Sequence, residues 1–184
     1  MTIFQAVIMA IAQGLTEFLP ISSSGHLAII PFIFNFQNEI SLSFDILLHM
    51  ATLIAVVIFL WKDIVEIFKG MFSGKKDTWL LILKIILAVV PAAIVGLLFK
   101  DQIKSLFYDP KLVGYAYFGT AALLFLTFFI KEGDKGISSI TWGDCLIIGV
   151  FQAFALIPGF SRSGFTLVGA LLIGMKSLDA FKFS

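Results

Sequence analysis

Charged side chains are scarce in this chain. Its 184 residues include 13 lysines and arginines and 12 acidic residues, whereas 59% are hydrophobic. The mean hydropathy is +1.02. Because a soluble domain is about 45–50% apolar and about a quarter charged, this composition excludes a water-soluble globule and a disordered chain. The net charge of +1 offers no basic surface for nucleic acid. The composition therefore predicts an integral membrane protein with a single membrane domain over residues 1–184.

Cysteine and arginine are each present once. The single cysteine, Cys145, excludes a disulfide framework and a multi-cysteine metal site. Arg162 is the only arginine, and residues 1–61 contain neither lysine nor arginine. The N-terminus also lacks the basic region of a signal peptide, so we expect no cleaved signal.

Three apolar segments are long enough to cross a membrane, which takes about 20 residues. Segments 79–99 and 112–130 meet this length, and the shorter segment 44–61 spans if tilted. The polar connections between and after these segments are 62–78, 100–111 and 131–143. These segments predict a polytopic all-α membrane protein.

The two ends of the chain show a different pattern, in which apolar segments of half length flank a polar break. Segments 2–12 and 27–36 flank the break 13–26, and segments 145–158 and 164–175 flank a Gly/Ser-rich break. Polar backbone at membrane depth is tolerated only where protein or a water-filled cavity satisfies it. Paired broken segments point to a central site in a membrane protein built from repeats. We therefore expect two re-entrant helical hairpins.

The two breaks match one another at an offset of 139 residues. Both read Gln-x8-Ser-x-Ser-Gly, with a proline shortly before the serines. The matched positions are Gln13, Ser22, Ser24 and Gly25 in the first copy and Gln152, Ser161, Ser163 and Gly164 in the second. We infer a duplication, in which repeat one begins near residues 1–61 and repeat two begins near residue 144.

The first break carries a carboxylate at membrane depth. Gln13 and Glu17 are four residues apart and share a face if this segment is helical. An ionised glutamate in hydrocarbon is costly and is usually functional. His26 is the nearest candidate partner, because a Ser-rich turn lets the chain fold back. The alternative is that Glu17 only caps or pairs with the loop.

The second break predicts an anion site. Backbone N–H groups at a helix start, with the small residues Ser161, Ser163 and Gly164, form an anion cradle. Arg162 adds a planar fork suited to bidentate contact with phosphate, and Thr166 adds a hydroxyl. The alternative for Arg162 is that it snorkels to the membrane interface. Phosphate or another oxyanion is the preferred ligand.

A second pair of polar residues lies in segment 44–61. Asp45 and His49 are four residues apart on one helix face and form a candidate relay or second layer around the site. The alternative is a carboxylate at a helix end and a packed, hydrogen-bonded histidine.

The two breaks together resemble the undecaprenyl-diphosphate phosphatases of the bacitracin-resistance type. The resemblance rests on Gln13-x-x-x-Glu17-Phe-Leu-Pro-Ile-Ser-Ser-Ser-Gly-His26 and on Pro158-Gly-Phe-Ser-Arg-Ser-Gly-Phe-Thr166. It implies inverted repeats whose re-entrant hairpins meet in a membrane cavity. The family's first motif commonly begins with glutamate where this chain has Gln13. Its members usually continue with further transmembrane helices beyond the position of Ser184, so we expect repeat two to be incomplete.

The resemblance also implies an activity, a location and partners. The activity is hydrolysis of undecaprenyl diphosphate to undecaprenyl phosphate and inorganic phosphate, which recycles the lipid carrier of peptidoglycan synthesis and confers bacitracin resistance. The protein is expected as a multi-pass protein of the plasma (inner) membrane, in contact with membrane lipids and with its polyprenyl diphosphate substrate. A homodimer is left open.

Diphosphate hydrolysis needs a nucleophile, acid–base groups and charge neutralisation. Ser23, or a water beside it, is the candidate nucleophile, with Glu17 and His26 as the acid–base pair and Arg162 on the transferred phosphoryl group. The phosphate-binding candidates are Ser22, Ser24, Ser161, Ser163, Gly164 and Thr166. A divalent cation, Mg²⁺ or Ca²⁺, is expected at Gln13 and Glu17, and no organic cofactor. A covalent intermediate and direct attack by water both stay open.

A secondary transporter or flippase of an anionic substrate is the alternative function, because such proteins use the same repeat plan. Arg162 would then bind the anion, and Glu17 with His26 would carry a coupled proton. A membrane scaffold would need none of these residues.

Overall fold

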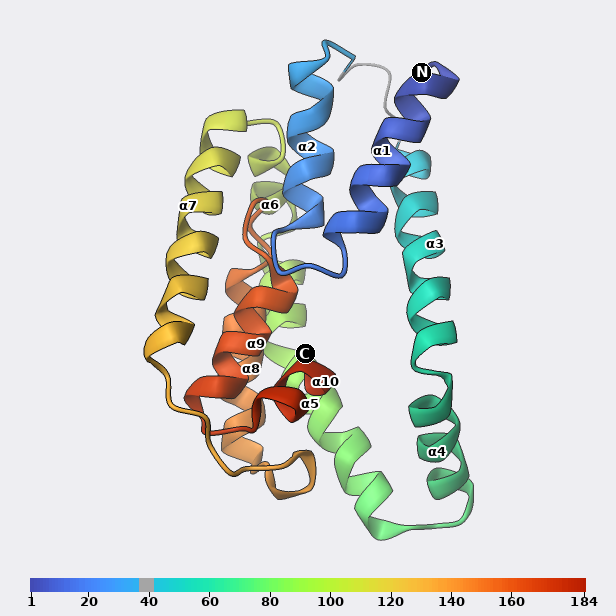
Figure 1. The fold of residues 1–184 in the computed structure, drawn as a ribbon, viewed down its shortest axis with the longest axis vertical. Coiled ribbons are helices and arrows are strands. Elements are labelled where there is room, and N and C mark those ends of the chain that lie inside the picture. The colour runs from blue at the N-terminus through green and yellow to red at the C-terminus, as the bar shows by residue number, and fades with distance from the viewer. Residues whose placement is uncertain (37–41) are drawn as a thin grey trace.

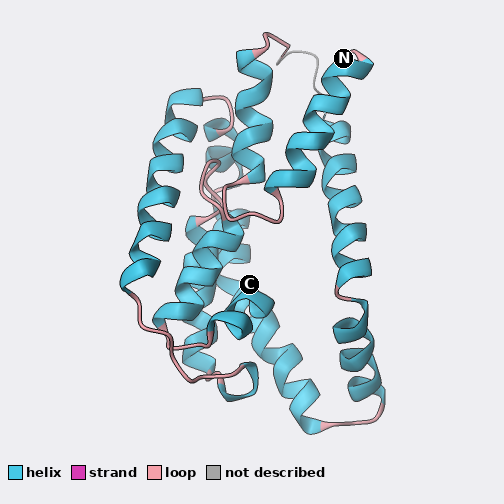
Figure 2. Cartoon of the chain, in the orientation of Figure 1, coloured by secondary structure: helices cyan, strands magenta, loops and turns pink. Residues whose placement is uncertain are grey.

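The structure, a computed structural model, describes residues 1–36 and 42–184, and helices dominate it (Figures 1 and 2). Within these residues the only bridge between extended segments joins Lys135 to Met175. The helices in chain order are α1 (Ile3–Thr16), α2 (Ser23–Ile33), α3 (Leu42–Phe59), α4 (Trp61–Phe72), α5 (Lys76–Leu98), α6 (Lys100–Leu106), α7 (Pro110–Leu126), η2 (Thr127–Phe129), η3 (Ile137–Ser139), α8 (Trp142–Phe154), α9 (Arg162–Leu172) and α10 (Ser177–Phe183).

The membrane-spanning prediction is confirmed for segments 79–99 and 112–130. α5 has 23 residues, and Pro110–Phe129, which comprises α7 and η2, has 20; both are long and apolar enough to cross a membrane. α3 and α4 pass the same test together, but the chain bends by 74° between Ser43–Phe59 and Trp61–Phe72. The protein is therefore an all-α membrane protein, and its described residues contain two helices able to span a membrane, or three if the bent pair is one span.

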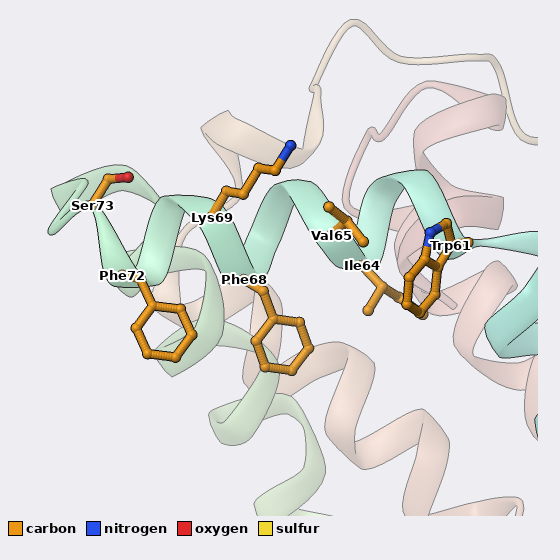
Figure 3. A pocket seen from close by; sticks show the side chains of 7 residues that line it. All are labelled: Trp61, Ile64, Val65, Phe68, Lys69, Phe72 and Ser73. Atoms are coloured by element: carbon orange, nitrogen blue, oxygen red, sulfur yellow. The ribbon is translucent and has the colours of Figure 1, made fainter.

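The predicted connection 62–78 is wrong in one respect, because most of it is the helix α4. Its apolar residues recur at helical spacing, so one side of the helix is apolar despite the lysines. Figure 3 shows Phe68 and Phe72 on one side of α4 and Lys69 on the other. A hollow of about 440 Å³ beside them is lined only by Trp61, Ile64, Val65, Phe68, Lys69, Phe72 and Ser73. None of the predicted site residues borders this hollow.

The four shorter apolar helices form two hairpins, in which α1 packs on α2 and α8 packs on α9. The hairpins run in opposite directions: α1 descends and α2 rises in Figure 1, whereas α8 rises and α9 descends. Both turns lie in the middle of the molecule. The polar breaks predicted from the sequence are therefore the turns of these hairpins.

Each hairpin has its own hydrophobic cluster. Met9, Leu27, Phe36 and Leu48 form the cluster around α1 and α2. A larger cluster joins α5, α8, α9 and α10, through Ala88, Ile140, Cys145, Ile148, Ala170, Met175 and Ala180. A Cβ atom built at Gly149 would lie 2.5 Å from the carbonyl oxygen of Ala88, so α8 and α5 pack backbone to backbone. Small residues at such contacts are typical of helix packing in membranes.

The offset of 139 residues recurs in the local geometry. A capping box starts α1 at Thr2 and another starts α8 at Thr141. A positive φ follows the second helix of each hairpin, at Asn35 and at Gly174. Each hairpin thus begins with a capping box and ends with a residue of positive φ, at positions 139 residues apart.

Candidate active site

The two polar breaks are in direct contact. A Cβ atom built at Gly25 would lie 2.9 Å from the Cα atom of Gly159, and one built at Gly164 would lie 3.4 Å from the Cβ atom of Pro20. Segments far apart in the sequence therefore form one site in the middle of the protein. The predicted residues of both breaks belong to the segments that make this contact.

Both breaks end in a serine that caps the following helix. The Ser22 hydroxyl accepts a hydrogen bond from the Gly25 amide at 3.2 Å, and the Ser161 hydroxyl accepts one from the Gly164 amide at 3.2 Å. The first amides of a helix have no partner within it and carry partial positive charge. Because α2 and α9 both start at this contact, their positive ends converge on one region, which favours an anion.

Gln13, Glu17 and Ser23 form a connected group in the first break. The Gln13 Nε2 atom donates to Glu17 Oε2 at 3.0 Å. The Ser23 hydroxyl donates to the same carboxylate oxygen. A serine whose hydroxyl faces a carboxylate has the arrangement of a nucleophile beside a general base.

His26 has a different partner from the one expected. Its Nδ1 atom lies 2.8 Å from the Ser22 carbonyl oxygen and 2.9 Å from the Tyr117 hydroxyl. The hydrogen bonds found for the Glu17 carboxylate, by contrast, come from Gln13 and Ser23. Ser23 is the first residue of α2, and His26, three residues later, is turned towards α7. The geometry therefore places Glu17 on Ser23 rather than on His26.

Arg162 is the first residue of α9, and its side chain is exposed. Within residues 1–36 and 42–184, the ion pairs found are Lys135–Asp144 and Lys182–Asp63, and neither involves this arginine. Its guanidinium group is thus available for an anionic ligand.

The predicted phosphate-binding hydroxyls divide into two groups. Ser22 and Ser161 are buried and serve as the helix caps described above. Ser24 lies 3.4 Å from Ser22, and Ser163 lies 3.3 Å from Ser161, hydroxyl to hydroxyl; both are half-buried. Thr166 is buried, and its hydroxyl donates to the Arg162 carbonyl at 2.8 Å, within α9. Ser24 and Ser163 are therefore the hydroxyls nearest to solvent.

α3 contributes a residue that the sequence analysis did not select. Thr52 is 7% exposed, and its hydroxyl accepts from Gln13 Nε2 at 3.2 Å. His49 is exposed, and its Nδ1 atom lies 2.8 Å from the backbone carbonyl of Asp45. The hydrogen bonds found do not join the side chain of Asp45 or of His49 to the site, although the His49 carbonyl accepts one from the Thr52 hydroxyl at 3.0 Å. The sequence feature that could have identified Thr52 is its place in an apolar helix, one turn beyond His49.

α7 supplies two more residues that were missed. The Thr120 hydroxyl donates to the Gly159 carbonyl at 3.0 Å and accepts from the Ser161 amide at 3.2 Å. Tyr117 contacts His26 as described above and also stacks against its ring edge to face, with centroids 5.3 Å apart. The sequence feature that could have identified them is a pair of polar residues, three positions apart, in the apolar segment 112–130.

One oxygen in the site lacks a partner among the described residues. Gln13 is 1% exposed, and its Oε1 atom is buried without a hydrogen bond. Buried polar atoms are nearly always paired, and an amide oxygen beside a carboxylate suits a hard cation. The described residues contain no cluster of three or more His, Cys, Asp or Glu that could hold a metal. Gln13 and Glu17 thus fit a cation that takes its other ligands from substrate and water.

These features define a class of protein: a polytopic helical membrane protein in which the polar turns of two opposed hairpins meet. The chain is 48% identical over 178 residues to the undecaprenyl-diphosphatase of Thermosipho africanus. The aligned residues make up 97% of this chain and 71% of that relative. The corresponding protein of Methanococcus vannielii is 46% identical over 178 residues, with shares of 97% and 71%. That of Parabacteroides distasonis is 41% identical over 186 residues, with shares of 100% and 69%. Residues 6–184 match the family described as bacitracin resistance protein BacA. The chain belongs to this family.

The contact between the breaks predicts the effect of a single methyl group. Gly25→Ala places a Cβ atom 2.9 Å from the backbone of Gly159, where only movement of one break can relieve the clash. We expect phosphate-releasing activity to fall by about 100-fold, because small displacements of catalytic groups are costly. The measurement is phosphate release from a polyprenyl diphosphate by purified protein. Gly114→Ala on α7 is the control, since a Cβ atom there meets nothing within 4 Å. Equal activity of the two variants would contradict the prediction.

Proposed function

We propose that this chain hydrolyses undecaprenyl diphosphate to undecaprenyl phosphate and inorganic phosphate. The observation that carries this proposal is the Ser23 hydroxyl donating to the Glu17 carboxylate where the α2 and α9 N-termini converge. Membership of the BacA family and the name shared by its relatives support the same activity. The reaction recycles the lipid carrier of peptidoglycan synthesis and underlies bacitracin resistance.

The chemistry starts at Ser23. Its Oγ atom attacks the terminal phosphorus as its proton passes to Glu17, and the bond from that phosphorus to the bridging oxygen breaks. Undecaprenyl phosphate leaves with the bridging oxygen, and a phosphoserine remains. Water then attacks the phosphoserine, releases inorganic phosphate and restores the serine hydroxyl. In the alternative, Ser23 and Glu17 orient a water that attacks directly.

The opposite side of the site neutralises charge. A transferred phosphoryl group carries its negative charge on three oxygens, so positioned donors lower the barrier. Arg162 and the first amides of α9 face this charge from the second break, with Ser163 beside them. The first amides of α2 and the Ser24 hydroxyl face it from the first break.

A divalent cation, Mg²⁺ or Ca²⁺, is part of the proposal. When bound, it would neutralise the charge of the diphosphate, with Glu17 and Gln13 as the residues that would hold it. Thr52 and Glu17 both accept hydrogen bonds from Gln13 Nε2, so the Oε1 atom takes no part in these contacts. The buried, unpartnered Oε1 atom supports this role.

The protein is membrane-bound, and we place it as a multi-pass protein of the plasma (inner) membrane with its site facing outward. Large apolar side chains are exposed along its helices, including Phe59 at 82% and Phe128 at 84%. Such surface suits lipid chains, and the polyprenyl tail of the substrate would lie among them. A homodimer stays a prediction.

The test of the activity also distinguishes the transporter alternative. Protein in detergent has no second compartment, so release of inorganic phosphate from undecaprenyl diphosphate supports hydrolysis. Absence of release under conditions where the protein stays folded and binds the lipid would favour transport.

Arg162→Lys is expected to lower kcat/KM by about 100-fold or more. A point charge cannot replace the two parallel donors of the guanidinium fork, and loss of one transition-state donor costs about 100- to 1,000-fold. The matched control is Lys182→Arg, which conserves charge at an exposed pair with Asp63 on α4. Near-parent turnover in Arg162→Lys would remove this residue from the site.

Ser23→Ala tests the nucleophile. We expect a loss of about 1,000-fold or more in kcat, as for the removal of other nucleophiles, and no phosphoserine on brief incubation with labelled substrate. Ser139→Ala is the control, because Ser139 is exposed at the end of η3 and, among the described residues, the hydrogen bond found for its hydroxyl is to the Gly136 carbonyl. A residual rate within about tenfold of the parent would assign the attack to water.

Chelation tests the cation. We expect EDTA to lower phosphate release by about tenfold or more, because the charge of the diphosphate is then neutralised by Arg162 and backbone amides alone. Added Mg²⁺ or Ca²⁺ should restore it, and Gln13→Ala should raise the concentration of ion needed, whereas Gln102→Ala on α6 should not. Full activity in EDTA would contradict the proposal.

A further inference from the structure

α7 touches both breaks from the same side. It packs on α2 and on α9, and Gly159 lies against its backbone at a positive φ of 96°, where a Cβ atom would be 2.5 Å from the Val113 carbonyl oxygen. Tyr117 and Thr120 are one helical turn apart, so they share a face of this helix. Tyr117 reaches the first break and Thr120 reaches the second.

The surroundings of His26 select one tautomer of its ring. Nδ1 lies 2.8 Å from the Ser22 carbonyl oxygen, which can only accept, so Nδ1 carries the proton. The Tyr117 oxygen, at 2.9 Å from Nδ1, is a second acceptor for the same proton. In a neutral ring with Nδ1 protonated, Nε2 holds the lone pair and can take a proton during the reaction.

Thr120 holds the second break at two points. It is 3% exposed, and its one hydroxyl pairs both with the Gly159 carbonyl and with the Ser161 amide. These two groups lie on either side of the turn that leads to Arg162. A buried backbone group left without a partner destabilises its conformation, so Thr120 determines where the start of α9 lies.

We propose that Tyr117 and Thr120 are positioning residues of the phosphatase. Tyr117 fixes the orientation of His26 and, as a second acceptor beside the Ser22 carbonyl, strengthens the tautomer protonated at Nδ1, and Thr120 positions the phosphate-binding turn. This inference rests on the proposed function. In this proposal α7 fixes the position of the first break, which carries His26, relative to the second break, which carries Arg162. Neither Tyr117 nor Thr120 touches the substrate.

The two residues should give different kinetic signatures. Tyr117→Phe should lower kcat by about tenfold or more, because it affects an acid–base group, with KM changed by less than about threefold. Thr120→Val should mainly raise KM, by about tenfold, because the turn that binds phosphate loses both hydrogen bonds. Thr120→Ser should restore the parent KM, since it keeps the hydroxyl.

Matched controls lie on the same helix and at its end. Tyr115→Phe makes the same change two residues away on the exposed side of α7. Thr127→Val removes a hydroxyl whose hydrogen bond, among the described residues, is to the Leu124 carbonyl within the same helical segment. Both controls should retain parent kcat and KM. Variants that match their controls, or a Thr120→Ser that behaves as Thr120→Val, would overturn the inference.

A readout without turnover separates this inference from the proposed function. The chain has two histidines, so protein labelled with ¹⁵N-histidine gives two sets of ring signals, which His49→Gln assigns. We expect His26 to be protonated at Nδ1 in the parent and in Tyr115→Phe, and to show a mixture of tautomers in Tyr117→Phe. Unchanged His26 signals in Tyr117→Phe would overturn the role of Tyr117 even if the parent is active. An inactive parent with the expected signals would instead count against the proposed function.

Discussion

The close contact between the Gly25 and Gly159 backbones is the constraint on which the rest of the structure depends. With Cβ atoms excluded there, two turns from opposite hairpins meet without side chains between them. Their contact brings the starts of α2 and α9 to one region, and with them Ser23 and Arg162. Neither hairpin alone holds both the serine–carboxylate pair and Arg162. The proposed active site therefore depends on the interface between the two hairpins.

The membrane imposes a second constraint on the two opposed hairpins, which is that the backbone groups of their turns need hydrogen-bond partners. Backbone groups in hydrocarbon must be paired, so a turn at that depth needs protein around it. Ser22 and Ser161 satisfy the amides of Gly25 and Gly164, and Thr120 satisfies two groups of the second turn. The remaining amides at the starts of α2 and α9 have no acceptor within their helices and can therefore bind an anion. The proposed site thus lies where the fold leaves backbone donors available.

Much of this arrangement could be predicted from the sequence, because it follows from local patterns. Apolar length predicts α5 and α7, and small polar residues between half-length segments predict the two turns. The partners of Glu17 and His26 could not be predicted, since they depend on which way successive α2 residues face once α7 is packed beside them. Thr52 and Tyr117 were missed for the same reason: a lone hydroxyl in an apolar helix gives no local sign of what lies opposite. α4 was missed because its lysines obscured a regular apolar side.

The short helices and the long helix α7 have different roles in the proposed site, and these roles follow from their lengths. Of the proposed reacting groups, Ser23 and Arg162 lie in the first turns of short helices, where amides and hydroxyls can meet a ligand, and Glu17 directly follows the last turn of α1. α7, long and capped by Asp109 at its start, has a continuous hydrogen-bonded backbone and can hold side chains at fixed separation. A site assembled from two separate turns needs such a common reference, because an error of about 1 Å between nucleophile and phosphate is costly. The same contact that makes Gly25 obligatory, with the Tyr117 hydroxyl 2.8 Å from its would-be Cβ atom, thereby joins the catalytic turn to the helix that aligns it.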